Sequence, residues 1–515
     1  MNRTTPTLLA AVAALAALTG VAAVAAPDDG SAHASAASRK PVERSTLVCP
    51  RPSDSDVADT SYTAFTPKGT ASAKGGKGGA ELYPIEAADT DGGSGKHKKD
   101  KDGKGDGKGG KDAKPKLPLR SPGTPVTSDT SETDAPALAG SADGPLAPGW
   151  TVQQTTDVGA GAGRGLEGTA CSVPDTAFWF PGASTSGSRQ DYIHLTNPDD
   201  TSAVVDVDLY GKHGKQSSRS GEGITVPPRS TKPVLLSTLA DGPKSDVTVH
   251  VVSRTGRVGA QVQAIDEESG GDWLPPTADP APSAVLPGIP KDATSVRLFV
   301  HAPGENDADL KLRFAGKSSE IAPAGHSTVH ARGGDTTVVE LHHLTNGEAG
   351  SLALEPSGDG AATPVVAAAE VTRGKGGKKE MGFLPSTVPV SRQATAAGAR
   401  GGDSTLALAA TGKPARVRVT SSAGSGGGSP ASRTYTVKGR TTRAVTPPKP
   451  KGLKGAYAVT VRRLSGGPLY ASRMLEKKES GVPAFTLQTL PDDRGTVSVP
   501  QSAQDLSVLN AGNGG

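Results

Sequence analysis

Residues 192–210 read YIHLTNPDDTSAVVDVDLY and carry the clearest strand pattern of the chain. In its last eight residues, valine and leucine alternate with Asp206 and Asp208, the period of two that is typical of a strand with one buried face. The segment NPDD at residues 197–200 predicts a tight turn, because proline fixes φ and the polar side chains hydrogen-bond to the nearby backbone. The stretch therefore predicts two strands joined by a turn.

Short runs of the same kind, rich in β-branched residues and bounded by Gly, Pro or Asp, continue from Trp150 to about Pro500. Three of the stretches close on a Leu-Pro pair, at residues 274, 384 and 490, which are spacings of 110 and 106. A period near 100 residues is typical of tandem β-sandwiches. The sequence therefore predicts an all-β fold with three Ig-like β-sandwich modules, over residues 150–285, 286–392 and 393–500.

Composition limits what else the chain can form. Of 515 residues, 34% are hydrophobic and 3% aromatic, and there are 67 glycines and 42 prolines. These values exclude one large compact core and a polytopic membrane protein. Residues 51–149 alternate Gly/Lys runs with Ser/Thr/Pro/Asp stretches, which predicts a long disordered linker, and residues 501–515 are expected to form a flexible tail.

The N-terminus carries the pattern of an export signal. Arg3 precedes the uncharged, alanine-rich run Leu8–Ala26. This pattern predicts that residues 1–36 are either a cleaved signal peptide or an uncleaved N-terminal membrane anchor. In both cases we expect an exported protein, either secreted or tethered to the outer face of the cytoplasmic membrane.

Export changes the interpretation of the two cysteines. Cys49 and Cys171 are the only cysteines in the sequence, and outside the cytoplasm an even pair favours a disulfide. Such a bond would tie residues 42–50 to the first module. Two unpaired buried thiols are the alternative, and a metal site is disfavoured because neither cysteine has a Cys or His at ligand spacing.

Positive charge is concentrated in one tract. The chain has a net charge of +4, whereas residues 96–116 alone contain nine lysines and four aspartates. The rest is nearly neutral, so we expect no basic face of the kind that binds nucleic acid. The tract is a solvated linker or an electrostatic contact with anionic envelope polymers or lipid headgroups. The candidate contacts are Lys98, Lys99, Lys101, Lys104 and Lys108.

No catalytic motif stands out. The sequence has neither a G-x-S-x-G elbow nor an H-E-x-x-H pair, and it predicts no catalytic, cofactor-binding or metal-binding residue. Trp179, Tyr210 and Trp273 are candidates for a glycan or partner contact, because aromatic rings stack on sugars. Residues of this kind are, however, first expected in the cores or rims of sandwiches.

A family resemblance rests on the segment that starts at Cys171. It reads CSVPDTAFWFPG and is followed by YIHLTNP at residues 192–198 and by a strand ending in Tyr210-Gly211. This pattern resembles DUF5719, a family of uncharacterised exported actinobacterial proteins. The resemblance covers most of the chain outside the linker, and it implies an envelope location, a β-rich exported part and no assigned activity.

The sequence therefore predicts a non-enzymatic exported cell-envelope protein, a scaffold or partner-binding array of β-sandwich modules. A cell-wall glycan-binding array is the alternative, and an extracellular hydrolase is a remote one. The expected partner is an envelope protein or a cell-wall polymer, together with the membrane if the N-terminal segment is uncleaved. We expect no cofactor and no nucleic acid.

Overall fold

The structure is a computed structural model, and it describes residues 38–69, 78–88, 114–216, 220–358, 361–479 and 481–499. The chain divides into two compact units, residues 41–495 and the two ends of the chain. In the unit of the chain ends, β1 (Ser38–Pro41) pairs with β37 (Thr496–Val499). The predicted export segment 1–36 and the predicted tail 501–515 lie outside the described residues.

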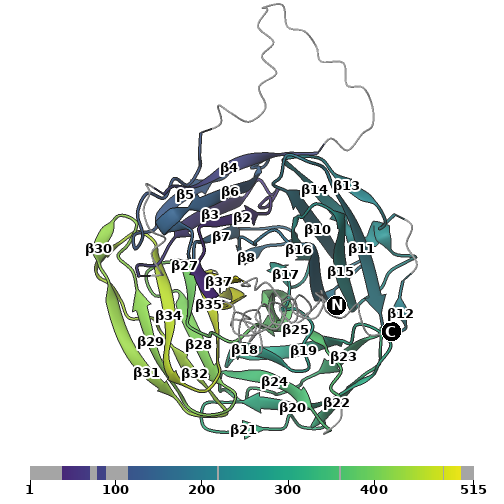
Figure 1. The fold of residues 1–515 in the computed structure, drawn as a ribbon. Helices are drawn as coiled ribbons and strands as arrows, with labels where there is room; N and C mark the ends of the chain where they lie inside the picture. Colours follow the sequence, from purple (N-terminus) through teal and green to yellow (C-terminus); the bar gives the residue numbers. More distant parts are fainter. Residues whose placement is uncertain are drawn as a thin grey trace, which may run out of the picture. The chain divides into compact units, whose positions relative to one another are not determined.

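Residues 41–495 form four modules of two β-sheets each (Figure 1). We call them module A (residues 42–171), module B (172–274), module C (284–385) and module D (393–490). The all-β class and the β-sandwich architecture are confirmed. The described residues contain three short 3-10 helices in addition: η1 (Gly144–Leu146), η2 (Leu236–Leu239) and η3 (Gly376–Lys378).

Modules A and B share one seven-stranded sheet. Its module A strands are β2 (Arg44–Cys49), β6 (Ala137–Asp143) and β4 (Ala80–Ala87), and its module B strands are β14 (Ser230–Leu235), β10 (Arg189–Asn197), β16 (Gly259–Asp266) and β17 (Gly270–Leu274). The parallel pair β4–β14 joins the two modules. The second sheet of module A contains β5 (Val126–Thr130), β3 (Ala58–Phe65), β7 (Thr151–Val158) and β8 (Gly165–Ala170). That of module B contains β12 (Gly214–Lys215), β13 (Ile224–Val226), β11 (Ala203–Gly211), β15 (Val247–Thr255) and β9 (Ala177–Ala183).

Modules C and D repeat the two-sheet plan. Module C pairs β18 (Ala284–Ile289), β24 (Gly350–Pro356), β20 (Ala308–Ala315), β21 (Glu320–Ile321) and β22 (Thr328–Ala331) in one sheet, and β23 (Thr336–Glu340), β19 (Ala293–His301), β25 (Val366–Arg373) and β26 (Glu380–Pro385) in the other. Module D pairs β27 (Gln393–Ala399), β34 (Tyr457–Gly466), β29 (Ala415–Ser421) and β31 (Ala431–Val437) in one sheet, and β32 (Thr441–Val445), β28 (Ser404–Ala410), β35 (Leu469–Glu479) and β36 (Val482–Thr489) in the other. A small hairpin, β30 (Gly427–Ser429) with β33 (Lys451–Lys454), completes module D.

Each module has its own core, which forms where its two sheets face each other. The alternation predicted for residues 203–210 is present in β11, where every second side chain is buried. Alanine and valine fill much of every core, so each sandwich stays small. The three Leu-Pro pairs predicted as module ends lie at the end of β17, in β26 and directly after β36.

The four modules close a cycle through one inner strand each. β8 contacts β17, β17 contacts β26, β26 contacts β36, and β36 contacts β8. Side chains cross these borders: Met381 and Phe383 of β26 belong to the core of module B, and Phe485 and Leu487 of β36 belong to the core of module C. A module therefore cannot leave the cycle without exposing a neighbour's core.

Two corrections to the predicted domains follow. Residues 51–149 are not simply a linker, because their described parts form β3 to β6 of module A. There are also four sandwiches instead of three, and residues 151–170 complete module A instead of starting the next module. The prediction failed because Gly/Lys-rich segments dominate the composition of this region. They separate the strands that carry the few large core residues of module A, such as Tyr62 and Leu82.

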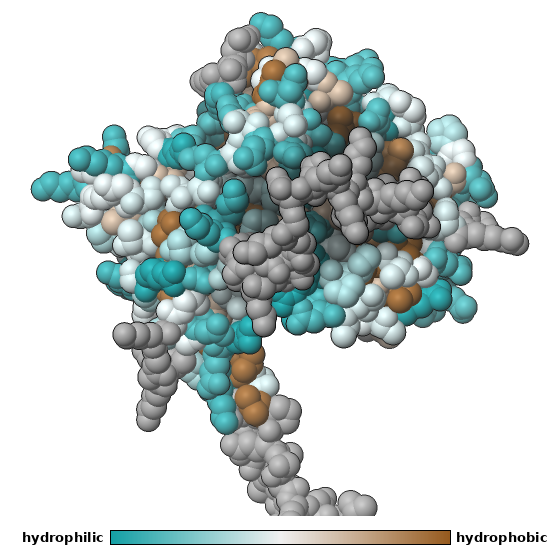
Figure 2. Space-filling model, turned by 90° about the horizontal axis from the view of Figure 1, so that it is seen from above, coloured by the Kyte–Doolittle hydropathy of each residue, from teal (hydrophilic) through white to brown (hydrophobic). Residues whose placement is uncertain are grey.

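The surface of the described residues is mostly polar. Figure 2 shows hydrophobic residues only in small separate areas where described residues are visible. The large hydrophobic side chains that are exposed are Val57, Ile321, Val388, Leu464 and Val497. In the part of the chain that the structure describes, no helix has the length and apolar character needed to cross a membrane.

Candidate functional site

The structure brings two of the three predicted aromatic contacts together. Trp179 of β9 lies directly opposite His250 of β15, and the two rings stack with centroids 3.6 Å apart and an interplanar angle of 8°. The ring centroid of Tyr210, on β11, lies 6.0 Å from that of Trp179. The ring centroid of His301, in module C, lies 5.3 Å from that of Trp179. We call Trp179, Tyr210, His250 and His301 the aromatic junction.

The aromatic junction lies on the border between modules B and C. His301 is completely buried, and its Nδ1 lies 2.9 Å from the carbonyl oxygen of Asp335. The Thr336 hydroxyl donates to the carbonyl oxygen of Tyr210 across the same border, at 2.7 Å. Burial lowers the pKa of both His250 and His301 to about 4, so both rings are neutral at pH 7.

This geometry disfavours the predicted stacking of a sugar on Trp179. A sugar-binding tryptophan needs a free ring face, whereas His250 already covers one face of Trp179, and Tyr210 and His301 flank the ring. Trp273 is completely buried, with its ring 5.1 Å from that of His194. Its place in the core explains why it is unavailable to a glycan. The interactions of the aromatic junction join two modules.

A second polar group lies where the inner strands meet. Glu167 of β8, Asp272 of β17 and Glu380 of β26 are each at most 1% exposed. The backbone N–H of Gly168 donates to Asp272 Oδ1 at 3.0 Å, and Gln263 Nε2 donates to Glu167 Oε2 at 3.1 Å. We call the three carboxyl groups the inner acids.

Burial favours the protonated form of the inner acids. It raises the pKa of Glu167 to about 8, that of Glu380 to about 7 and that of Asp272 well above its usual range. A protonated carboxyl group can act as a general acid, yet these side chains are too deeply enclosed for a substrate to reach them. Among the described residues, no group of three His, Cys, Asp or Glu side chains is placed to hold a metal ion.

The inner acids predict how stability depends on pH. A folded state that retains protons released by the unfolded chain loses stability as pH rises through the raised pKa values. We therefore expect the denaturation midpoint to fall between about pH 7.5 and 9, above the range in which the histidines of the unfolded chain titrate. Glu167→Gln is expected to flatten this fall, because glutamine keeps the hydrogen bond with Gln263 and carries no charge.

Guanidinium denaturation at several pH values measures this effect. Glu132→Gln, which changes an exposed glutamate of the same module, is the matched control and should keep the wild-type slope. An identical pH slope in wild type and Glu167→Gln would contradict the assignment of Glu167 as a protonated group.

The predicted disulfide is confirmed. Cys49 and Cys171 are bonded across a sequence separation of 122. The bond ties β2 to the segment that follows β8, where the backbones of Val48 and Ser172 exchange two hydrogen bonds of 2.8 Å. Residues 42–50 are therefore held inside module A, and not against a module that begins at Trp150.

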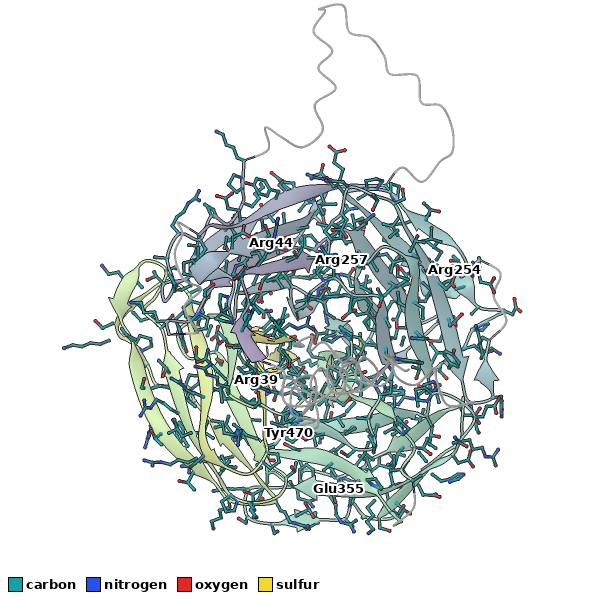
Figure 3. The ribbon with its side chains drawn as sticks, in the orientation of Figure 1. Arg39, Arg44, Arg254, Arg257, Glu355 and Tyr470 are labelled. Atoms are coloured by element: carbon teal, nitrogen blue, oxygen red, sulfur yellow. A yellow bond between two sulfur atoms is a disulfide. The ribbon has the colours of Figure 1, made fainter. Side chains whose placement is uncertain are left out.

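The remaining charged residues named from the sequence have no part in these two groups. Lys98, Lys99, Lys101, Lys104 and Lys108 lie outside the described residues. Asp206 and Asp208, on the solvent side of β11, form ion pairs with Arg254 and Lys215. Figure 3 shows Arg254 on the outer side of module B.

A polar cleft of about 650 Å³ opens on module A. Its charged side chains satisfy one another: Arg120 pairs with Glu81 at 2.7 Å, and the Tyr83 hydroxyl donates to the same carboxylate at 2.5 Å. This internal pairing leaves no converging set of free catalytic groups in the cleft.

The strong positive charge of module D was not predicted from the sequence. Between Ser404 and Leu475 the chain has thirteen arginine and lysine residues and neither aspartate nor glutamate. The expectation of a neutral body without a basic face is wrong for module D. Counting charge module by module, and not over the whole chain, would have revealed it.

Comparison with known proteins gives one match. The model of DUF5719, a family of unknown function, matches residues 126–448, which span part of module A, all of modules B and C, and much of module D. No curated protein matches the chain. No solved structure matches it either.

Proposed function

Since the chain belongs to the DUF5719 family, whose function is unknown, we propose from its own features that it is a non-enzymatic exported cell-envelope protein that acts as a scaffold or partner-binding body. The export signal expected from residues 1–36 and the disulfide both favour a location outside the cytoplasm. In this proposal the four modules act as one rigid body and not as flexibly linked domains.

The closed cycle of inner strands is the observation that carries this proposal. Besides the shared cores, partly buried ion pairs cross the borders between modules. Arg189 of module B contacts Glu370 of module C at 2.9 Å, and Arg373 of module C contacts Glu476 of module D at 3.2 Å. Tyr470 of β35 and Glu355 of β24 lie at the border of modules C and D (Figure 3). The pKa of Tyr470 is raised mainly by burial and in addition by the negative charge of Glu355.

A body of this kind can present several outer sheet faces in fixed positions. Some buried polar groups bind across module borders, such as Arg189 with Glu370 and Thr336 with the backbone of Tyr210, and such contacts contribute specificity to the assembly. Function then belongs to the outer faces and loops, where sandwich proteins usually bind their partners.

Co-sedimentation with isolated bacterial cell-wall sacculi tests the proposal. In this proposal the partner is a cell-wall polymer, so we expect the purified full chain to pellet with the sacculi and to release no soluble sugar or peptide from them during prolonged incubation. The heat-denatured chain is the control for trapping in the pellet. Release of wall fragments would contradict the non-enzymatic role, and a protein that stays in the supernatant would contradict attachment to the wall.

A further inference from the structure

Module D carries a cationic sheet face without matching acids. In β29, Val417 and Val419 point into the core, whereas Arg416 and Arg418 alternate with them and are exposed. On the neighbouring strand β34, exposed Arg462 lies directly opposite Arg418. The alternation of the strand therefore places all three guanidinium groups on the outer face of one sheet.

Hydroxyl groups border these arginines on the other side. Exposed Thr434 of β31 lies opposite Arg418, and exposed Thr436 lies opposite Arg416. We call Arg416, Arg418, Arg462, Thr434 and Thr436 the arginine face. Because adjacent strands lie about 4.8 Å apart, its donors are close enough to bind neighbouring groups of one ligand.

The charge of the arginine face is not compensated within the described residues. Several arginines of the other modules lie against carboxylates, such as Arg254 with Asp206 and Arg297 with Asp246. None of the three arginines of the arginine face has an ion-pair partner in the part of the chain that the structure describes. Like charges placed directly opposite on a sheet repel, so the face is more stable with an anion on it.

The rest of the same sheet face is already covered. Phe65 of module A packs against Ala397 of β27 and Ala458 of β34. The open part is therefore limited to β29, β31 and the far end of β34. Lys413 and Lys438 extend the positive charge at the end where the loops before β29 and after β31 approach each other.

The geometry points to one class of occupant. We infer that the arginine face binds a phosphodiester polymer of sugar or polyol units that carries no nucleobases, a chemistry that fits a wall-attached protein, and this inference rests on the proposed function. Guanidinium groups and hydroxyls are the donors that phosphate oxygens prefer, and a repeating polyanion can engage several of them at once.

The chemistry of the face argues against nucleic acid as the occupant. Sheets that bind single-stranded nucleic acid present exposed aromatic rings on which bases stack. The nearby Tyr435 is only 7% exposed and belongs to the core of module D. Its ring is contacted by Arg433 and Arg443, at 5.6 and 5.1 Å from the ring centroid. The arginine face therefore recognises charge and not bases.

The test compares two charge-matched variants of the full chain. One is Arg416→Gln with Arg418→Gln and Arg462→Gln. The other is Lys311→Gln with Lys317→Gln and Arg332→Gln, which removes three exposed cations of module C that also have no ion pair with a described residue. The probe is synthetic poly(glycerol phosphate), and its affinity is measured by isothermal titration calorimetry between 50 and 300 mM salt, a range on the order of that used for counterion-release analysis.

We expect the arginine-face variant to lose at least about tenfold in affinity at low salt and the control variant to change little. The slope of log affinity against log salt should fall by about 2, since about 0.7 counterions are released per neutralised phosphate on a flexible chain. Equal weakening in both variants would overturn the site, because it would indicate only net charge. Tighter binding of a thymidine oligonucleotide or of anionic lipid vesicles than of poly(glycerol phosphate) would overturn the polymer class.

The same variants separate this inference from the proposed function. If the arginine-face variant still pellets with sacculi as the wild type does, the arginine face is not the wall contact and the scaffold role stands. If the wild type binds the polymer but not the sacculi, attachment to the wall fails while the polymer site stands.

Discussion

Arg189→Ala is expected to destabilise the four-module unit by about 3–5 kcal/mol, because it leaves a buried carboxylate without its partner. Asp191 is completely buried at its side chain, and Arg189 contacts its two oxygens at 2.8 and 3.1 Å. Arg189 also donates to Glu370 of module C at 2.9 Å. Burial raises the pKa of Asp191 to about 6 even with this arginine in place. Without Arg189, the ionised form of Asp191 would be still less favourable.

Guanidinium denaturation followed by tryptophan fluorescence measures this loss, since Trp179 and Trp273 both belong to module B. The matched control is Arg229→Ala, which breaks an exposed ion pair with Asp200 in the same module and should leave the midpoint nearly unchanged. Arg189→Met combined with Asp191→Leu should recover much of the lost stability, because it removes both buried charges. A single variant as stable as the control would contradict the structural role of this pair.

Loss of the disulfide should have an effect of similar size on module A. The bond between Cys49 and Cys171 closes a loop of about 120 residues, and the chain-entropy estimate for such a loop is about 4–5 kcal/mol as an upper value. The paired replacement Cys49→Ser and Cys171→Ser should therefore lower the unfolding midpoint of the whole four-module unit, and Trp150 in the core of module A contributes to the fluorescence that reports it.

Reductant supplies the control for this prediction. Dithiothreitol should lower the midpoint of the wild type to that of the double variant, and it should leave the double variant unchanged. A wild-type midpoint that does not respond to complete reduction, verified by thiol counting, would show that hydrogen bonds such as those between Val48 and Ser172 already hold β2 in place.

Local patterns were sufficient for part of the fold. The alternation over residues 203–210 identified β11, the Leu-Pro spacing marked the ends of three modules, and the even cysteine pair indicated the bond. Each of these signals depends on neighbouring residues or on a simple count. Module A lacks such local signals. Its last strand, β8, ends at Ala170-Cys171 and not at a Leu-Pro pair, and Gly/Lys-rich segments separate the strands of the module.

The candidate sites depended on pairings that periodicity does not determine. Alternation assigns Trp179 to a face of its strand, but only the register of β9 with β15 places it opposite His250. Glu167, Asp272 and Glu380 are about a hundred residues apart in the sequence, and closure of the cycle brings their strands together. The arginine face was visible as an acid-free stretch, yet the small net charge of the whole chain concealed it.

Native-state hydrogen exchange distinguishes one closed body of four modules from a set of separable domains. The amides of β8, β17, β26 and β36 should exchange with a single common free energy of opening, close to that of global unfolding, because no inner strand can open while its neighbours stay packed. Protection of β8 that is clearly lower than that of the other three would contradict the closed cycle and would make module A an independent domain.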